Sequence, residues 1–265
     1  MTVRWINQLI FAAAVFALPY GAQAQGGGAG APPATGKAGA PTDLTGYWVS
    51  VVTEDWRYRM VTPAKGDYAS VPLNPEGRKV ADTWDPAKDE AAGEQCKAYG
   101  AAAIMRVPGR VHIDWQDDST LKVETDAGTQ TRQFHFGPSQ APAGATTLQG
   151  YSAANWESAP VAGNAAAANN SPGAVMNRPM PGGSLKVVTD HLKAGYLRKN
   201  GVPVSANAKV TEYYTRTNEP NGDAWLIVTT IVDDPQYLNL PFITSTHFKK
   251  QKDNAGWAPT PCSAR

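Results

Sequence analysis

Alternating side chains are the feature that most constrains the fold of this 265-residue chain. Short segments rich in β-branched and aromatic residues alternate between apolar and polar positions, as is typical of antiparallel β-strands. Turn residues separate the segments: "DAGT" supplies Gly128, and "NEPNGDA" contains the turn pair Asn221 and Gly222. The pattern predicts nine strands, over residues 46–53, 110–116, 120–125, 129–136, 148–156, 184–191, 209–217, 225–232 and 242–249.

Helical patterning is confined to one stretch, "NPEGRKVADTWDPAKDEAAGEQCKAYG". It predicts a short helix over residues 76–84, after Pro75, and a later turn that presents Cys96. Many consecutive strands with one short helical excursion predict a mainly β, antiparallel barrel of about eight to nine strands, because a closed barrel leaves no exposed strand edge. A two-sheet sandwich is the alternative architecture.

The first residues, "MTVRWINQLIFAAAVFALPYGAQAQ", carry a basic residue at Arg4, then a short apolar run and the small-residue sequence "AQA". This order predicts a secretory signal peptide over residues 1–24, cleaved after Ala24. Its apolar run is shorter than the roughly 20 residues that span a bilayer. We therefore expect a periplasmic or secreted protein with no membrane span, a disordered Gly/Ala/Pro leader over residues 25–42, and a single β-barrel domain over residues 43–265.

Export also bears on the two cysteines, Cys96 and Cys262, because disulfides persist in oxidising compartments. We expect them to pair and to close a loop, which by the chain-entropy model stabilises the fold by about 4–5 kcal/mol. Two separate buried thiols are the alternative.

The charge balance, 24 basic and 23 acidic residues, gives a net charge of +1 without a dense basic stripe. Nucleic acid is therefore not an expected partner.

An insertion over residues 158–183, between two predicted strands, is poor in bulky apolar residues. It predicts a low-complexity loop at one rim of the barrel, and a lid over the cavity is the second interpretation.

The phase of the strands predicts which polar residues meet. Arg132 shares a strand face with Phe134, opposite His135, and Glu212 shares a face with Tyr214. If both faces point into the barrel, Arg132 and Glu212 form a charge-assisted pair. The alternative is that they lie on the solvent face of an ordinary antiparallel sheet.

A barrel with such an interior favours a secreted binding protein that holds a small apolar or aromatic molecule, with the oligomeric state left open. The candidate ligand-binding residues are Tyr47, Trp115, Arg132, Phe134, His135, Glu212, Tyr214 and Trp225. A second hypothesis is a lyase, isomerase or hydrolase in the same cavity. In it His135 or His191 acts as acid or base, Arg132 stabilises negative charge, and Glu212 is the accompanying carboxylate. A third is an envelope protein that binds another protein.

No cofactor or metal is expected from the motifs. The four histidines have no metal-ligand spacing; they are His112, His135, His191 and His247. "GYSAANW" lacks the second glycine of a nucleophile elbow, and phosphate-binding and dinucleotide motifs are absent from the sequence.

Two resemblances add to these expectations. The stretch "TGYWVS", with Gly46 and Trp48, resembles the Gly-x-Trp opening of lipocalins, many of which also tie a C-terminal segment to the barrel by a disulfide. More broadly, Arg132 with His135, the Trp-Glu of "GYSAANWE" and the Asp-Asp-Pro of "DDPQYLNLP" resemble a family of exported bacterial lipocalin-like β-barrels. That family has largely unassigned function, so the resemblance implies a lipocalin-like fold and no particular reaction.

Overall fold

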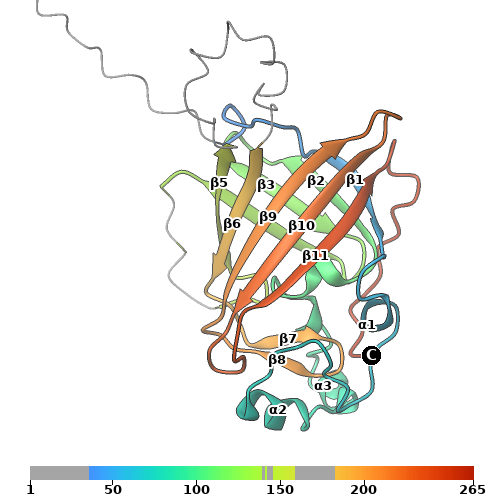
Figure 1. Cartoon of the computed structure of the whole chain (residues 1–265), viewed down its shortest axis with the longest axis vertical. Helices are drawn as coiled ribbons and strands as arrows, with labels where there is room; N and C mark the ends of the chain where they lie inside the picture. Colours follow the sequence, from blue (N-terminus) through green and yellow to red (C-terminus); the bar gives the residue numbers. More distant parts are fainter. Residues whose placement is uncertain (1–35, 139–140, 142–145, 159–182) are drawn as a thin grey trace, which may run out of the picture. The chain divides into compact units, whose positions relative to one another are not determined.

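The computed structural model describes residues 36–138, 141, 146–158 and 183–265, and its main element is a closed barrel of nine strands (Figure 1). The order around the barrel is β1, β11, β10, β9, β6, β5, β4, β3, β2. The bounds are β1 Gly46–Val51, β2 Arg110–Trp115, β3 Thr120–Thr125, β4 Gln130–Phe136, β5 Tyr151–Ser158, β6 Gly183–Asp190, β9 Lys209–Asn218, β10 Ala224–Asp233 and β11 Phe242–Lys250. The predicted barrel is confirmed, and the sandwich alternative is wrong.

One neighbouring pair departs from the predicted antiparallel arrangement. Strands β4 and β5 run parallel, with Phe134 opposite Ser152 and Phe136 opposite Ala154. All other neighbours in the barrel are antiparallel. In this register Tyr151, at the start of β5, lies beside the middle of β4, and both strands run in the same direction. The barrel is therefore mixed.

Strand boundaries agree with the predicted ranges to within three residues. The largest shift is at β5, which begins at Tyr151 instead of residue 148. Gly150 causes it: its φ of 61° lies in the left-handed region, and a Cβ there would come within 2.3 Å of the Asp190 carbonyl oxygen. Only glycine permits this close turn into the strand.

The helical elements are short, and alternation did not predict most of them. They are α1 Trp56–Met60, α2 Pro75–Ala81, α3 Pro86–Ala91 and the 3₁₀ turns η1 Lys97–Tyr99 and η2 Ile104–Arg106. Helix α2 overlaps the predicted helix and begins after Asn74, whose side chain accepts the Gly77 N–H at 2.8 Å. None of these helices is long and apolar enough to cross a bilayer, within the residues that the structure describes.

A hairpin of β7 (Gly195–Arg198) and β8 (Val202–Val204) forms a separate two-stranded sheet. It interrupts the barrel sequence between β6 and β9, and its strands are too short for alternation to reveal. In Figure 1 the hairpin and helices α1–α3 gather at one end of the barrel. The elements that the sequence patterns did not predict, the β7–β8 hairpin with α1 and α3, therefore lie at this end.

Large side chains fill the barrel interior. Trp48, Phe134, Tyr214 and Phe248 are each at most 1% exposed and belong to one apolar cluster. The Trp48 indole N–H donates to the Leu44 carbonyl at 2.9 Å, which satisfies its one polar atom. Residues 98–105, around η1 and η2, add Tyr99, Ile104 and Met105 to the same cluster. A dense interior of this kind resembles a packed core more than an open cup.

The predicted Arg132 and Glu212 pair is confirmed inside this core. Arg132 donates two hydrogen bonds to the Glu212 carboxylate, at 2.9 and 2.6 Å, and both side chains are at most 1% exposed. Arg132 also donates to Tyr214 and Thr189, each at 3.3 Å. Burial alone would lower the pKa of Arg132, but the adjacent Glu212 charge outweighs it and raises that pKa.

The chain ends of the described region meet the barrel. Cys96 and Cys262 are bonded at 2.02 Å, as predicted. Residues 36–42, the last part of the predicted leader, are hydrogen-bonded to the barrel: the Lys37 N–H donates to the Asp118 carbonyl at 2.9 Å, and the Trp156 indole donates to the Gly36 carbonyl at 2.8 Å. These hydrogen bonds compensate for the lack of large apolar side chains. Residues 1–35, which include the predicted signal peptide, and residues 159–182 of the predicted loop lie outside the described residues.

Loss of the disulfide should destabilise the fold. The bond joins residues 166 positions apart, so the Cys96→Ser/Cys262→Ser variant should lose about 5 kcal/mol in free energy of unfolding, by the chain-entropy model. Urea unfolding of the oxidised protein and the variant measures the difference, and thiol labelling before and after reduction checks the bond. Equal urea midpoints would contradict this expectation.

Breaking the buried ion pair should be more costly than breaking an exposed one. Glu212→Ala leaves the Arg132 charge buried without a partner, a change that typically lowers the free energy of unfolding by about 3–5 kcal/mol. The control is Glu76→Ala at the exposed pair with Lys79, whose side chains are 57% and 79% exposed; it should cost less than about 1 kcal/mol.

The Arg132→Met/Glu212→Leu variant should regain most of the loss, because apolar residues replace both charges. Thermal and urea unfolding of the wild type, Glu212→Ala, Glu76→Ala and the double variant measure these differences in free energy of unfolding. A Glu212→Ala protein as stable as the wild type would be incompatible with the buried pair.

Candidate functional site

The structure brings four of the predicted site residues together inside the barrel. Arg132, Phe134, Glu212 and Tyr214 are each at most 2% exposed, and the rings of Phe134 and Tyr214 lie 5.4 Å apart. They contact one another instead of lining any pocket described here. Trp115 also points inward but lies half-buried at the end of β2, 5.4 Å from the Phe136 ring.

Three other candidate ligand-binding residues, Tyr47, His135 and Trp225, lie on the outer surface of the barrel and do not line its interior. Tyr47 stacks on His112 with ring centroids 4.2 Å apart, and His135 stacks on Tyr151 at 5.0 Å. Trp225 lies beside Lys249, which is 6.0 Å from its ring. Strand alternation explains all three, because each is adjacent in sequence to a residue that points inward.

The histidines of the enzyme hypothesis do not join Arg132 and Glu212. His135 points away from them, and His191 follows β6 in a left-handed conformation with φ of 54°. The His191 side chain is 55% exposed, and its Nδ1 lies 2.6 Å from the Asp190 carboxylate. Among the described residues, no three His, Cys, Asp or Glu side chains are grouped in a way that could hold a metal ion.

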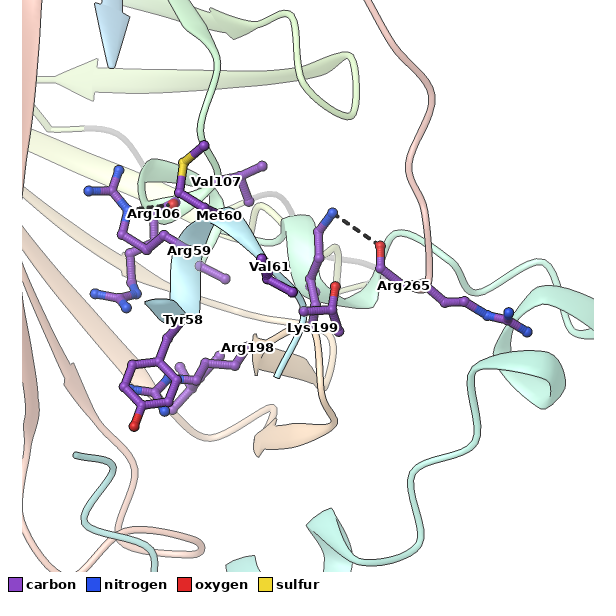
Figure 2. A pocket seen from close by; sticks show the side chains of 13 residues that line it. Tyr58, Arg59, Met60, Val61, Arg106, Val107, Arg198, Lys199 and Arg265 are labelled. Carbon is purple, nitrogen blue, oxygen red and sulfur yellow. Dashed lines mark hydrogen bonds between the residues drawn. The ribbon is translucent and has the colours of Figure 1, made fainter. Parts of the chain in front are cut away.

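A pocket of about 200 Å³ lies at the end of the barrel that carries α1 and β7 (Figure 2). We call it the arginine pocket. Its lining contains five cationic residues and no acidic one. The lining residues are Tyr58, Arg59, Met60, Val61, Thr62, Ala98, Ala103, Arg106, Val107, Leu197, Arg198, Lys199 and Arg265.

Three separate elements supply the buried arginines of the arginine pocket: Arg59 from α1, Arg106 from η2 and Arg198 from the end of β7. Arg59 Nε donates to the Arg106 carbonyl at 2.9 Å, and Arg198 Nη1 donates to the Ala69 carbonyl at 2.7 Å. The Arg198 guanidinium also lies over the Tyr58 ring, 4.4 Å from its centroid. All three residues are less than 10% exposed.

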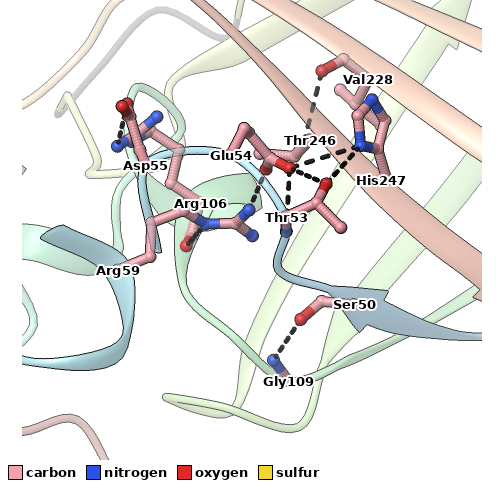
Figure 3. Close-up of polar contacts among 10 residues, drawn as sticks. All are labelled: Ser50, Thr53, Glu54, Asp55, Arg59, Arg106, Gly109, Val228, Thr246 and His247. Atoms are coloured by element: carbon pink, nitrogen blue, oxygen red, sulfur yellow. Dashed lines mark hydrogen bonds and ion pairs between the residues drawn. The ribbon is translucent and has the colours of Figure 1, made fainter. Parts of the chain in front are cut away.

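Acidic partners hold two of these arginines (Figure 3). Arg59 forms an ion pair with Glu54, and Arg106 with Asp55 at 3.1 Å. Asp55 has a φ of 49°, a conformation that aspartate tolerates better than most residues, and its carbonyl accepts the Tyr58 and Arg59 N–H groups at the start of α1. Asp55 therefore fixes both the helix and the Arg106 side chain.

Glu54 connects the arginine pocket to the barrel wall. Its carboxylate accepts from the Thr53 hydroxyl at 3.0 Å and lies 3.3 Å from Nδ1 of His247, on the outer face of β11. The Glu54 side chain is 25% exposed, so this acidic group lies at the edge of the cluster. Arg198, by contrast, has no carboxylate partner in the described part of the chain.

Several donor atoms of the three arginines have no hydrogen-bond partner within the described protein: Nη2 of Arg59, Nη1 of Arg106, and Nε and Nη2 of Arg198. Burial lowers the pKa of all three guanidinium groups. For Arg198 the next cause is the positive charge of Arg106, which also contributes to the lowering for Arg59. The arginines thus repel one another in a site with too few acceptors, and an anion would relieve both problems.

The chain matches no protein-family model, no curated protein and no solved structure. The arrangement of residues is therefore the basis for assigning the site. One sequence signal was available: Arg106 interrupts the apolar run "AAAIMRV", as Arg132 interrupts its own strand. Arg59 and Arg198 carry no comparable signal, because short elements position them.

The excess of buried positive charge in the arginine pocket should be measurable in the stability of variants. Arg198→Met removes a buried charge that has no carboxylate partner, so its free energy of unfolding should stay within about 1 kcal/mol of the wild type or exceed it. Glu54→Gln removes the partner of Arg59 and should lower that free energy by about 2 kcal/mol, between exposed and fully buried pairs. Urea unfolding measures both. A strongly destabilised Arg198→Met protein would contradict the charge imbalance.

Proposed function

We propose that this protein is an exported binding protein whose arginine pocket holds a small anion with a carboxylate or phosphate group. The observation that carries the proposal is the convergence of Arg59, Arg106 and Arg198, all buried, with guanidinium N–H groups that have no acceptor in the described protein. Planar guanidinium groups bind such oxygens in pairs, which makes arginine the usual residue for recognising these anions.

The charge balance of the arginine pocket supports an anionic ligand. Glu54 and Asp55 pair with Arg59 and Arg106, and Glu90 pairs with Arg265 at 3.9 Å. Lys199 donates to the Arg265 oxygen at 3.4 Å, so Arg198 is the buried lining cation whose charge no described carboxylate offsets. A unit negative charge about 4 Å from one cation gains about 4 kcal/mol at the effective dielectric constant near a protein surface. Several cations around one site multiply this attraction.

The size of the arginine pocket limits the ligand. Its volume of about 200 Å³ is below the roughly 300 Å³ at which pockets for drug-sized molecules begin. Val61, Val107 and Leu197 provide some apolar lining beside the cations. The ligand is therefore a small anion, or the anionic end of a larger molecule.

The arginine pocket is a better candidate site than the barrel interior. An apolar ligand in the barrel would compete with Trp48, Phe134, Tyr214 and Phe248 for space that these side chains fill. The barrel then serves as the rigid scaffold for elements at its end, a common way to build a binding site.

Export and family membership are parts of the proposal. Support for export comes from the Cys96–Cys262 bond, which is typical of oxidising compartments, and from the signal-like sequence of residues 1–24. Support for the lipocalin-like family comes from the closed nine-strand barrel and from Trp48 of the Gly-x-Trp opening, which is buried inside it.

Anion binding can be tested directly with inorganic phosphate and glycerol phosphate. Isothermal titration at constant ionic strength should show binding, and a ligand at 100 times its Kd should stabilise the fold by about 2.7 kcal/mol. Arg198→Met should weaken binding at least tenfold, because it removes the guanidinium that has no carboxylate partner.

Arg57→Met is the matched control. Arg57 lies on the same helix as Arg59, does not line the arginine pocket, and has a 67% exposed side chain paired with Asp67. This variant loses the same charge as Arg198→Met but should bind phosphate like the wild type. Equal weakening by both variants would reduce the effect to general electrostatics, and no heat of binding in the wild type would refute the proposal.

A further inference from the structure

Exposed apolar side chains gather beside the arginine pocket. Five large apolar residues are exposed in the described parts of the chain, and three of them fall within residues 56–61. Trp56 is 64% exposed, Met60 59% and Val61 67%. Such side chains are individually ordinary on a protein surface, but a cluster of three at the rim of a charged pocket marks an interaction surface.

Helix α1 connects this apolar cluster to the arginine pocket. Trp56 and Met60 are four residues apart, so they lie on the same face of the helix, and Met60 and Val61 line the pocket. Arg59, on the same helix, is 8% exposed and turned inward. One short element therefore presents apolar groups to solvent and a cation to the arginine pocket, at a spacing fixed by its backbone.

We propose that this surface docks on a phospholipid bilayer, with the phosphate of a lipid headgroup in the arginine pocket and with Trp56, Met60 and Val61 in the interfacial layer. We call Trp56, Met60 and Val61 the docking residues. The proposal rests on the anion site of the proposed function and names the source of the anion. It concerns binding at the membrane surface and requires no spanning segment.

Charge complementarity favours a bilayer as the occupant. Phospholipid surfaces offer phosphate groups directly beside apolar chains, which matches a cationic pocket rimmed by apolar side chains. Tryptophan is enriched at this boundary because its ring is apolar and its N–H is polar. A pocket of about 200 Å³ accommodates a headgroup. The acyl chains then remain outside it, beside the exposed docking residues.

Stable attachment to a membrane surface usually needs two signals acting together, since either alone is weak and reversible. The docking residues supply the apolar signal, and the arginine pocket supplies the electrostatic one. Each should therefore be necessary: removing either should reduce binding to vesicles at least tenfold.

Vesicle sedimentation with the full chain tests the proposal. The wild type should bind vesicles of phosphatidylglycerol and phosphatidylcholine, and bind vesicles of phosphatidylcholine alone at least tenfold more weakly. Trp56→Ser/Met60→Ser should lose at least tenfold in affinity for the anionic vesicles yet bind inorganic phosphate like the wild type. Circular dichroism checks that this variant is folded, as expected for two exposed positions.

The matched control is Leu240→Ser/Ile243→Ser, which removes two other apolar side chains of similar exposure, 68% and 62%. It should bind the anionic vesicles like the wild type. Equal loss in both double variants would overturn the proposal, because apolar contact would then not be specific to α1. No binding of the wild type to the anionic vesicles would overturn it too, and a positive phosphate titration would leave the anion site standing.

Arg198→Met separates the two proposals further, and it should lose both phosphate and vesicle binding. Vesicle binding at wild-type strength in this variant would overturn headgroup recognition by the arginine pocket. Short-chain phosphatidylglycerol, used below its micelle concentration, tests the source of the anion. Affinity for these monomers equal to that for vesicles would overturn docking on a bilayer and identify a free amphiphile as the ligand.

Discussion

Closure of the barrel through β1 is the constraint on which the remaining structure depends. Strand β1 bonds to β2 on one side and to β11 on the other, so the sheet has no free edge. A ring of nine strands has a limited interior, and Trp48, Phe134, Tyr214 and Phe248 occupy it. Because the interior is a core, the arginine pocket lies outside it, where α1, η2 and β7 meet at one end.

Two buried arginine sites show how differently a protein can treat the same charge. Arg132 has a carboxylate, a phenol and a hydroxyl as acceptors, and Glu212 raises its pKa. Arg198 has one carbonyl as acceptor and another arginine nearby, and its pKa is lowered. Only Nε of Arg132 lacks a hydrogen-bond partner, and this paired arginine belongs to the core. A cluster of arginines with several unpartnered donors beside a pocket is where an external anion gains most.

Local alternation was enough to predict the nine barrel strands and the shared face of Arg132 and Phe134, because both depend on a period of two residues. It left open whether that face points into the barrel or toward solvent. It could not predict that the interior is full, since this depends on the summed volumes of side chains from all strands. Alternation within a strand also carries no information on whether neighbouring strands are parallel, so it could not predict the parallel pairing of β4 with β5. The arginine pocket was missed because α1 and β7 are five and four residues long, too short for a periodic signal.

The pairing of β1 with β11 also determines the order in which the molecule can be assembled. Trp48 and Lys250 are opposite each other in the ladder although nearly the whole folded sequence separates them. Local hairpins such as β2–β3 and β9–β10 can form as soon as their residues are available, but the ring cannot close until β11 exists. Contacts between distant parts of a chain slow folding, so closure is the late step. Until then β1 has an unpaired edge, the stage at which the chain is most open to association with other chains.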